Sequence, residues 1–240
     1  MQALALESLP GFRRRFRVTP GPGWVRSEVE DDYHCMGVTL HHDGKFVTAI
    51  DPELLRAPWT TCPGAPAQLK QTFTGVALDA FAARGDKTAN CTHLYDIALL
   101  AAAHALDAQP LVYDVLVADA IDGQRRAEVR RDGVPVLAWT ESAFRISEPV
   151  ELAGMTLDKL RPWIDSLTPD EQEAARLLRW ANMIANGRQI PIEQQSDAKR
   201  MPSNCYTFQP ERKVIARRVG VIRDFSKGSA QPLDGMAVDL

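Results

Sequence analysis

The sequence predicts an α+β fold: an antiparallel sheet of two meanders packed around a central Ala-rich helix, with a helical C-terminal portion. Two stretches, residues 12–50 and 111–148, contain runs that alternate apolar and polar side chains at period two, as half-buried strands do. Residues 91–106 lie between them and have an interior made almost entirely of Ala and Leu. Such a thin helix favours close packing on more than one side.

The first meander is expected to contain a tight hairpin. Asp43-Gly44 separates two alternating runs, and this dipeptide favours hairpin turns because it tolerates positive φ. Pro20-Gly21-Pro22-Gly23 marks an earlier turn. The strands expected from this pattern are residues 12–18, 24–30, 34–40 and 45–50.

From Asp51 onward the pattern indicates helix and loop instead of strand. Proline and glycine residues between positions 58 and 66 predict an irregular path. Asn90 is expected to cap the Ala-rich helix, because its side chain can accept from the free amides of the first turn. The helices expected here are residues 67–73, 76–84 and 91–106.

The second meander is expected to turn at Asp122-Gly123 and at Asp132-Gly133. The run of apolar residues from Val112 to Val117 is nearly continuous, which is typical of a strand covered on both faces. The expected strands are residues 111–120, 125–131 and 134–140, with residues 144–148 as an extension.

The C-terminal portion is expected to be mainly helical. Thr168-Pro169-Asp170-Glu171 has the form of a capping box with Pro at the first helical position, and its helix is expected to end at Gly187. The other expected features are a helix at residues 156–167, an exposed loop at 188–204, and strands at 205–208 and 214–222. We expect residues 1–150 to form the α+β core and residues 151–240 to pack on the same domain as a helical extension and tail.

Composition narrows the class of protein. The 240 residues are 45% hydrophobic and 25% charged, as in ordinary globular proteins, and the net charge of -3 provides no basic surface for nucleic acid. No run approaches the roughly 20 apolar residues of a membrane helix, and no signal peptide is evident. Four widely spaced cysteines favour reduced thiols. We therefore expect a cytoplasmic protein that binds neither nucleic acid nor membrane.

Titratable groups gather between residues 31 and 104, where apolar side chains would fill the same volume without a desolvation cost. His34 and His93 are the candidate general bases. Asp96 lies three residues beyond His93 on the expected helix and can orient its ring, and Asp32 is the candidate partner of His34. A satisfied structural pair is the alternative for each histidine.

Cys91 at the start of a helix would be a reactive thiolate if the helix dipole dominated. A small packed side chain is the commoner role of a cysteine beside an Ala/Leu helix. His34, Cys62, Cys91 and His93 are acceptable zinc ligands, but their spacing matches no usual zinc pattern. We therefore expect no metal and no cofactor, and we place Cys62 and Cys91 among the substrate contacts.

Arg56, Trp59 and Tyr95 complete the expected site, with Tyr206 as a further ring contact. An arginine beside aromatic rings in a Pro-rich loop can hold a carboxylate or phenolate while the rings stack on an aromatic substrate. The alternative is a loop filled by Trp59, with Arg56 paired to a surface acid.

Several short motifs resemble the bacterial family catalogued as domain of unknown function 2889, over roughly residues 12 to 145. They are His34-x-Met36, the Asp-Gly hairpin, Thr61-Cys62-Pro63, Leu69, Gly75 and, as the most specific piece, Asn90-Cys91-Thr92-His93-Leu94. Asp96 stands where the family pattern suggests Glu. The resemblance implies a link to the catabolism of lignin-derived aromatic compounds, including enzymes that remove a hydroxymethyl group as formaldehyde.

The candidate bases, cation and aromatic contacts, combined with the resemblance, predict a cofactor-independent lyase that acts on a phenolic dimer by acid–base chemistry. His34 or His93 would be the base, with Arg56 as the cation that stabilises phenolate or quinone-methide charge. The expected partners are a small aromatic substrate and a second copy of the chain in a homodimer. A thiol- or zinc-dependent hydrolase and a non-catalytic ligand-binding or assembly protein are the alternatives.

Overall fold

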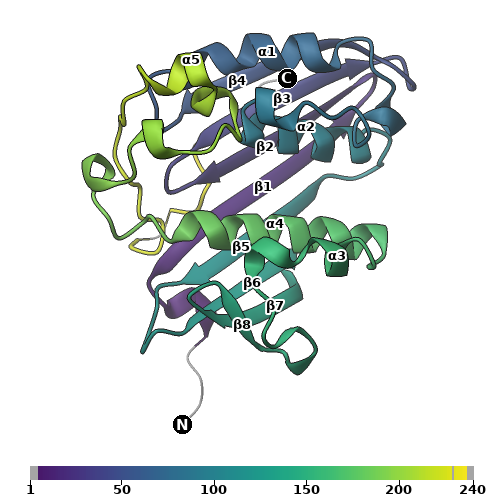
Figure 1. The fold of residues 1–240 in the computed structure, drawn as a ribbon. Helices are drawn as coiled ribbons and strands as arrows, with labels where there is room; N and C mark the ends of the chain where they lie inside the picture. Colours follow the sequence, from purple (N-terminus) through teal and green to yellow (C-terminus); the bar gives the residue numbers. More distant parts are fainter. Residues whose placement is uncertain (1–4, 229, 237–240) are drawn as a thin grey trace. The chain divides into compact units, whose positions relative to one another are not determined.

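The computed structural model describes residues 5–228 and 230–236 and confirms the α+β class (Figure 1). Its strands form an eight-stranded sheet in the order β4-β3-β2-β1-β5-β6-β7-β8. The contacts divide the described chain into two compact units, and strand β1 (Gly11–Gly21) contributes to both. We call residues 16–111 with 190–222 the first-meander unit, and residues 5–15, 112–189 and 223–236 the second-meander unit. This division does not coincide with the expected boundary at residue 150, and both ends of the chain lie outside the described residues.

The first-meander unit contains the hairpins expected from the alternating pattern. Strand β2 (Trp24–Asp31) pairs antiparallel with β3 (Cys35–His42), and β3 pairs antiparallel with β4 (Val47–Arg56). Gly44 adopts a φ of +93° in the turn between β3 and β4. Strand β4 continues through the region expected to be helix and loop. Pro52 is tolerated there because β4 is an edge strand, where a missing amide donor costs little.

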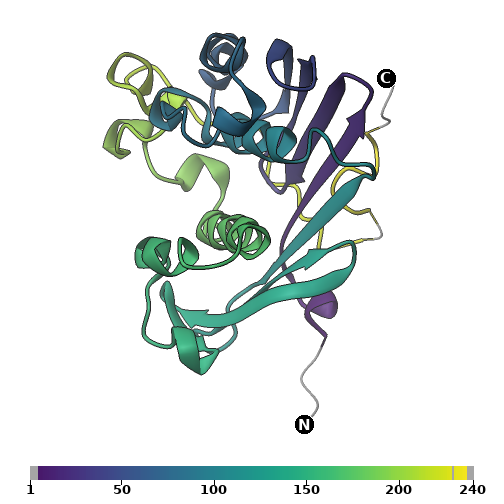
Figure 2. The same cartoon turned by 90° about the vertical axis from the view of Figure 1, so that its right-hand side faces the viewer.

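The two longer helices of this unit are α1 (Ala65–Phe73), which contacts β4, and α2 (Thr92–Ala103), which contacts β2 and β3 (Figures 1 and 2). The residue that precedes α2 as its N-cap is Cys91, so the expected capping by Asn90 is wrong. The Asn90 amide instead donates to the Thr72 hydroxyl and the Asp86 carbonyl. The helix expected at residues 76–84 is only a 3-10 turn, Leu78–Ala80.

Residues 190–222 contain no strand, so the two strands expected at 205–208 and 214–222 are wrong. The segment forms short 3-10 turns, among them Tyr206–Phe208, and one helical turn, α5 (Pro210–Lys213). Pro210 provides no amide for a sheet and suits the first position of a helix. Phe208 packs with Trp59, Cys62 and Ala198 in a small apolar cluster. The only pairing with a sheet-like pattern in this part of the described chain is an isolated bridge between Trp59 and Arg218.

The second-meander unit is built as expected from its turns. Asp122-Gly123 and Asp132-Gly133 all have positive φ, and they separate β5 (Leu111–Ala118), β6 (Arg125–Arg131) and β7 (Val134–Ser142). Strand β8 (Arg145–Glu148) follows, then the short helix α3 (Arg161–Ile164).

Helix α4 (Pro169–Ala185) begins with the predicted capping box and contacts β6 and β7. The side-chain oxygen of Asn182, on this helix, accepts a hydrogen bond from the Trp139 indole N–H at 2.7 Å. Each meander therefore has its own helix, α2 on β2 and β3 and α4 on β6 and β7 (Figure 2). The expectation that both meanders wrap around the Ala-rich helix is wrong in this respect. None of the helices in the described part of the chain has the length and apolar composition to span a membrane.

Candidate functional site

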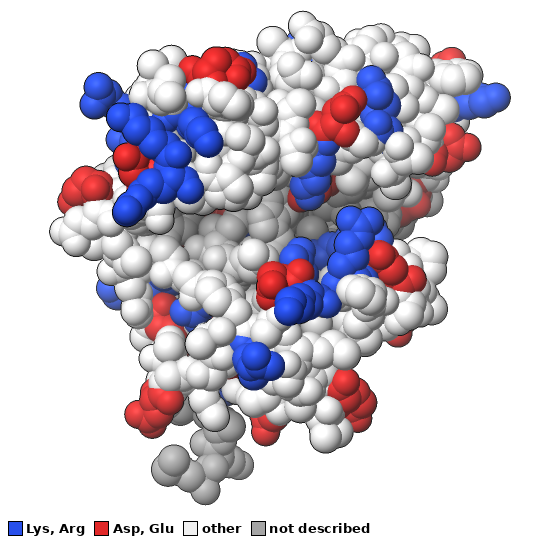
Figure 3. All heavy atoms as spheres, in the orientation of Figure 1, with Lys and Arg blue, Asp and Glu red and all other residues white. Residues whose placement is uncertain are grey.

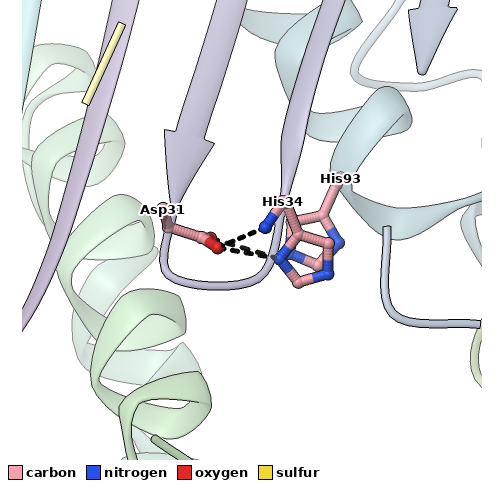
Figure 4. A group of neighbouring side chains, drawn as sticks. All are labelled: Asp31, His34 and His93. Carbon is pink, nitrogen blue, oxygen red and sulfur yellow. Dashed lines mark hydrogen bonds and ion pairs between the residues drawn. The ribbon is translucent and has the colours of Figure 1, made fainter. Parts of the chain in front are cut away.

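The candidate site lies in the first-meander unit, where the loop between β2 and β3 folds back on the carboxylate of Asp31. Asp31 Oδ1 accepts from the backbone amides of Tyr33 at 2.7 Å and His34 at 2.8 Å. The same carboxylate contacts His34 Nδ1 at 3.0 and 3.2 Å (Figure 4). Because an ionised carboxylate only accepts, this contact favours the form of His34 that carries a proton on Nδ1. Both side chains are buried.

His93 supplies the second imidazole of the site. It is the second residue of α2, and its ring stacks on that of His34 with 3.7 Å between centroids and 27° between planes (Figure 4). One ligating atom from each of Asp31, His34 and His93 lies within 4.8 Å of the others. The two histidines predicted from sequence are thus together, and the carboxylate that joins them is Asp31.

Arg56 fixes this loop from the end of β4. Its guanidinium donates to the carbonyls of Asp31 at 2.7 Å and Asp32 at 2.8 Å, and to Glu30 Oε1 at 2.9 Å. A further bond of 3.3 Å reaches the carbonyl of His34. These bonds use both hydrogens of Nη2 and one hydrogen of Nη1, so most of the guanidinium is engaged with the loop and with Glu30. The structure therefore places Arg56 as a residue that positions the loop.

Asp96 and Tyr95, also predicted for the site, have other partners. The Lys87 ammonium donates to both carboxylate oxygens of Asp96, at 2.5 and 2.7 Å, and the Tyr95 hydroxyl donates to the Gly85 carbonyl at 2.7 Å. Both contacts hold α2 against the loop that precedes it. The carboxylate that orients a histidine is Asp31 and not Asp96. Asp32 is buried, and its carbonyl accepts from Arg56.

Three cysteines of this unit have thiols whose pKa is raised by burial, which favours the protonated form. Burial raises the pKa of Cys91 to about 12, and the pKa of Cys205 to about 11. Burial also raises the pKa of Cys62, whose thiol contacts the Thr207 hydroxyl at 3.3 Å. Bonds from backbone amides at the start of α2 act in the opposite direction on Cys91 but do not outweigh burial. Of the two roles that the sequence left open for Cys91, burial therefore favours the packed side chain over the reactive thiolate.

The predicted aromatic contacts lie around the segment that follows Cys205. Trp59 is buried against Phe208, edge to face, with 5.5 Å between centroids. The Tyr206 amide donates to the Asn90 carbonyl at 2.8 Å, which brings Tyr206 next to the start of α2. The Arg212 guanidinium covers the Tyr206 ring at 3.8 Å. Tyr206 is thus near the helix that carries His93, as expected, although an arginine occupies one of its faces.

Three residues near the site were missed from the sequence: Asp31, Tyr33 and Arg218. Asp31 stands three residues before His34, a spacing typical of a carboxylate that caps its own turn. The Tyr33 ring lies 6.0 Å from that of His34, and burial raises the pKa of its hydroxyl. Arg218 covers the Trp59 ring at 4.0 Å. No local pattern indicates Arg218, because 158 residues of chain separate it from Trp59.

The arrangement can transfer protons. Asp31 holds one imidazole in a fixed orientation and tautomer, with a second imidazole in contact. The same three side chains are also suitable metal ligands, and neither Cys62 nor Cys91 belongs to the group. Comparison of the chain with models of protein families and with curated proteins finds no match.

Proposed function

We propose that this chain is an enzyme that acts on a small molecule by general acid–base catalysis at His34 and His93, with Asp31 as the orienting carboxylate. One observation carries the proposal: a buried Asp31–His34 hydrogen bond of 3.0 Å beside a second imidazole stacked at 3.7 Å. A structural pair would need only one histidine and its acid. A second imidazole against the first adds a group that can exchange protons.

The contact between the rings determines how they share protons. Two imidazolium ions at this distance repel each other, so the pair favours a state with a single positive charge. One ring is then a proton donor and the other a proton acceptor. Asp31 stabilises the charge when it resides on His34.

The reaction class is taken from the sequence resemblance and fits this pair. In a phenolic dimer with a benzylic hydroxyl and a neighbouring hydroxymethyl group, the phenol releases its proton to solvent water, and the benzylic hydroxyl leaves as water with a proton from the imidazolium. This produces a quinone methide. The neutral imidazole then removes the hydroxymethyl O–H proton, the C–C bond breaks, and formaldehyde leaves. The electron pair of that bond forms the stilbene double bond and restores the phenolate, so no redox agent is required.

Variants of the two histidines test the proposal. Protein treated with a chelator is incubated with phenolic dimers, and formaldehyde and stilbene absorbance are measured. We expect His34→Gln and His93→Gln each to lower kcat by about 100-fold or more. His41→Gln is the matched control, because His41 forms an exposed pair with Asp51 on the same sheet. Equal release from all three variants and the wild type would refute the role of the pair.

A metal-dependent hydrolase is the second candidate, and the convergence of Asp31, His34 and His93 within 4.8 Å favours it. Two histidines and a carboxylate are a common ligand set for zinc and iron. Metal analysis of the purified protein and return of activity when zinc is added after chelation distinguish this candidate. The expected homodimer and the cytoplasmic location remain predictions.

A further inference from the structure

Arg218 is a half-buried cation of the first-meander unit. Its guanidinium lies 4.0 Å from the centre of the Trp59 ring, and its Nε is buried without a hydrogen-bond partner. Across residues 5–228 and 230–236, no carboxylate forms an ion pair with it. Burial lowers the pKa of Arg218, and the groups that oppose this effect are Tyr33 and Cys62.

The backbone holds Arg218 in this place. The Val219 amide donates to the Pro58 carbonyl at 3.1 Å, and the Thr60 amide donates to the Arg217 carbonyl at 3.0 Å. These two backbone hydrogen bonds lie on either side of the isolated β-bridge that pairs Trp59 with Arg218. The guanidinium is therefore stacked on a buried ring that is itself fixed, which reduces the entropy lost when it binds a ligand.

Other arginines of the first-meander unit do have acidic partners. Arg26 pairs with Glu28 and Glu53, Arg17 with Glu28, and Arg56 with Glu30. A desolvated cation without an acceptor costs free energy, so it is normally paired. Among the residues that the structure describes, none supplies such a partner to Arg218, and an anion from solution would supply one.

We propose that Arg218 and Trp59 form an anion subsite that binds the carboxylate or phenolate oxygen of an aromatic ligand. The inference rests on the proposed function in that the ligand is the substrate of the histidine pair. Tyr33 links the two places, because its ring lies 6.0 Å from His34 and its hydroxyl interacts electrostatically with Arg218. The subsite thus takes the role of the cation that was expected of Arg56.

The charge around the subsite supports an anionic ligand. Residues 190–222 carry six basic and three acidic side chains, although the whole chain has a net charge of -3. Lysine and arginine side chains gather around α5, at the upper left of Figure 3. Such a local excess of positive charge attracts anions and raises their rate of encounter.

Binding of simple aromatic probes tests the subsite without any turnover. Calorimetry would compare benzoate, 4-nitrophenolate and neutral benzamide on the wild type, Arg218→Gln and Arg217→Gln. We expect Arg218→Gln to lose about tenfold or more in affinity for both anions, with benzamide unchanged. Arg217 is the matched control because its side chain is exposed, and its variant should bind all three probes as the wild type does.

Arg218→Lys covers the case in which the glutamine variant fails to fold. It keeps the charge but not the planar donor pair, so we expect an anion affinity between those of arginine and glutamine. Wild-type anion affinity in Arg218→Gln, or equal losses for benzamide and benzoate, would overturn the subsite. If the anions bind through Arg218 but no phenolic dimer releases formaldehyde, the subsite stands and only the proposed reaction fails.

Discussion

At the scale of single residues, Asp31 determines the geometry of the site. Its carboxylate accepts from two backbone amides and from the His34 ring, so it shapes the loop and fixes the tautomer together. A buried carboxylate in this setting has its charge satisfied by hydrogen bonds from the loop itself. The orientation of His34 and the conformation of the loop therefore depend on one side chain.

Replacing Asp31 by Asn separates these two tasks. The amide oxygen can still accept from the loop, but the charge that stabilises a protonated His34 is lost. We expect kcat to fall by at least about tenfold with little change in KM, and stability to fall by about 1.5–3 kcal/mol in urea unfolding. Asp51→Asn, at an exposed pair, is the control. An unchanged kcat would mean that Asp31 only shapes the loop.

The thiols provide a second prediction at this scale. Because the pKa values of Cys62, Cys91 and Cys205 are all raised by burial, few thiolates exist near neutral pH. Iodoacetamide at about pH 8 should modify the native cysteines far more slowly than the urea-unfolded ones, as counted by mass spectrometry. Activity should persist in the native protein after this treatment. Rapid loss of activity with labelling of Cys62 or Cys91 would support the thiol alternative.

Sequence reasoning found both imidazoles but not their carboxylate, and the reason is local. Asp96 was chosen because helical spacing from His93 is visible in the sequence, whereas Lys87 reaches Asp96 from the loop before the helix. Asp31 faces His34 only because the chain reverses between β2 and β3. Side-chain direction within such a turn depends on backbone torsions that apolar periodicity does not encode.

At the scale of elements, strand β4 supports the site through its last residue. Arg56 crosses from β4 to the loop after β2 and bonds three carbonyls and Glu30. The loop that carries His34 is thereby joined to a strand two positions away in the sheet. Residues 51–56 of β4 were expected to lie in a helix and loop, so this connection could not be seen from the sequence.

Arg56→Gln tests the connection between β4 and the loop. The change removes most of these bonds and leaves the buried Glu30 carboxylate without its cation. We expect a loss of about 2–4 kcal/mol in the free energy of unfolding, together with a lower kcat. Lys70→Gln, which removes an exposed ion pair with Asp51, should cost less than about 1 kcal/mol. A similar small loss for both variants would show that the loop holds its shape without Arg56.

Elements with strong local signals were predicted well. The Asp-Gly turns and the alternating runs located β2, β3, β6 and β7, and the capping box located the start of α4. The prediction of strands failed for residues 205–222, where apolar side chains pack in a cluster around Trp59 and do not join a sheet. The pattern of apolar residues in a segment does not determine which surface of the protein the segment will pack against.

At the scale of the whole molecule, ion pairs of the second-meander unit determine part of the response of stability to acid. In the second-meander unit, buried Arg188 bonds Asp119 and Asp224. Burial alone would raise the pKa of Asp224, but hydrogen bonds from Ser226 and the Arg188 charge lower it to about 2. The folded state therefore binds this proton more weakly than the unfolded state does.

The sign of the pH effect follows from that lowered pKa. Asp224 contributes stability above its ordinary pKa of 3.8, and this contribution is lost as the pH falls toward about 2. Asp224→Asn should be less stable than the wild type near neutral pH and should lose less stability on acidification, measured by urea unfolding at several pH values. Asp170→Asn, at an exposed pair with Arg131, should follow the wild type. Parallel curves for wild type and Asp224→Asn would contradict this assignment.

The alternating runs and the Ala-rich stretch were enough to predict the α+β class, but they could not assign helices to strands. The expected contacts on several sides of α2 are confirmed, because α2 contacts α1 and two 3-10 turns as well as β2 and β3, but the helix that contacts β6 and β7 is α4. That choice depends on contacts between segments distant in sequence. The convergence of Asp31, His34 and His93 has the same origin, since 58 residues of chain lie between His34 and His93.

The rate of formaldehyde release by metal-stripped protein as a function of pH, between about 5 and about 9, tests the proton-sharing histidine pair most directly. A pair with one protonated and one neutral ring predicts a bell-shaped profile, which His34→Gln and His93→Gln should both abolish. Activity that appears only after a metal ion is added, or a profile that neither variant alters, would contradict the account.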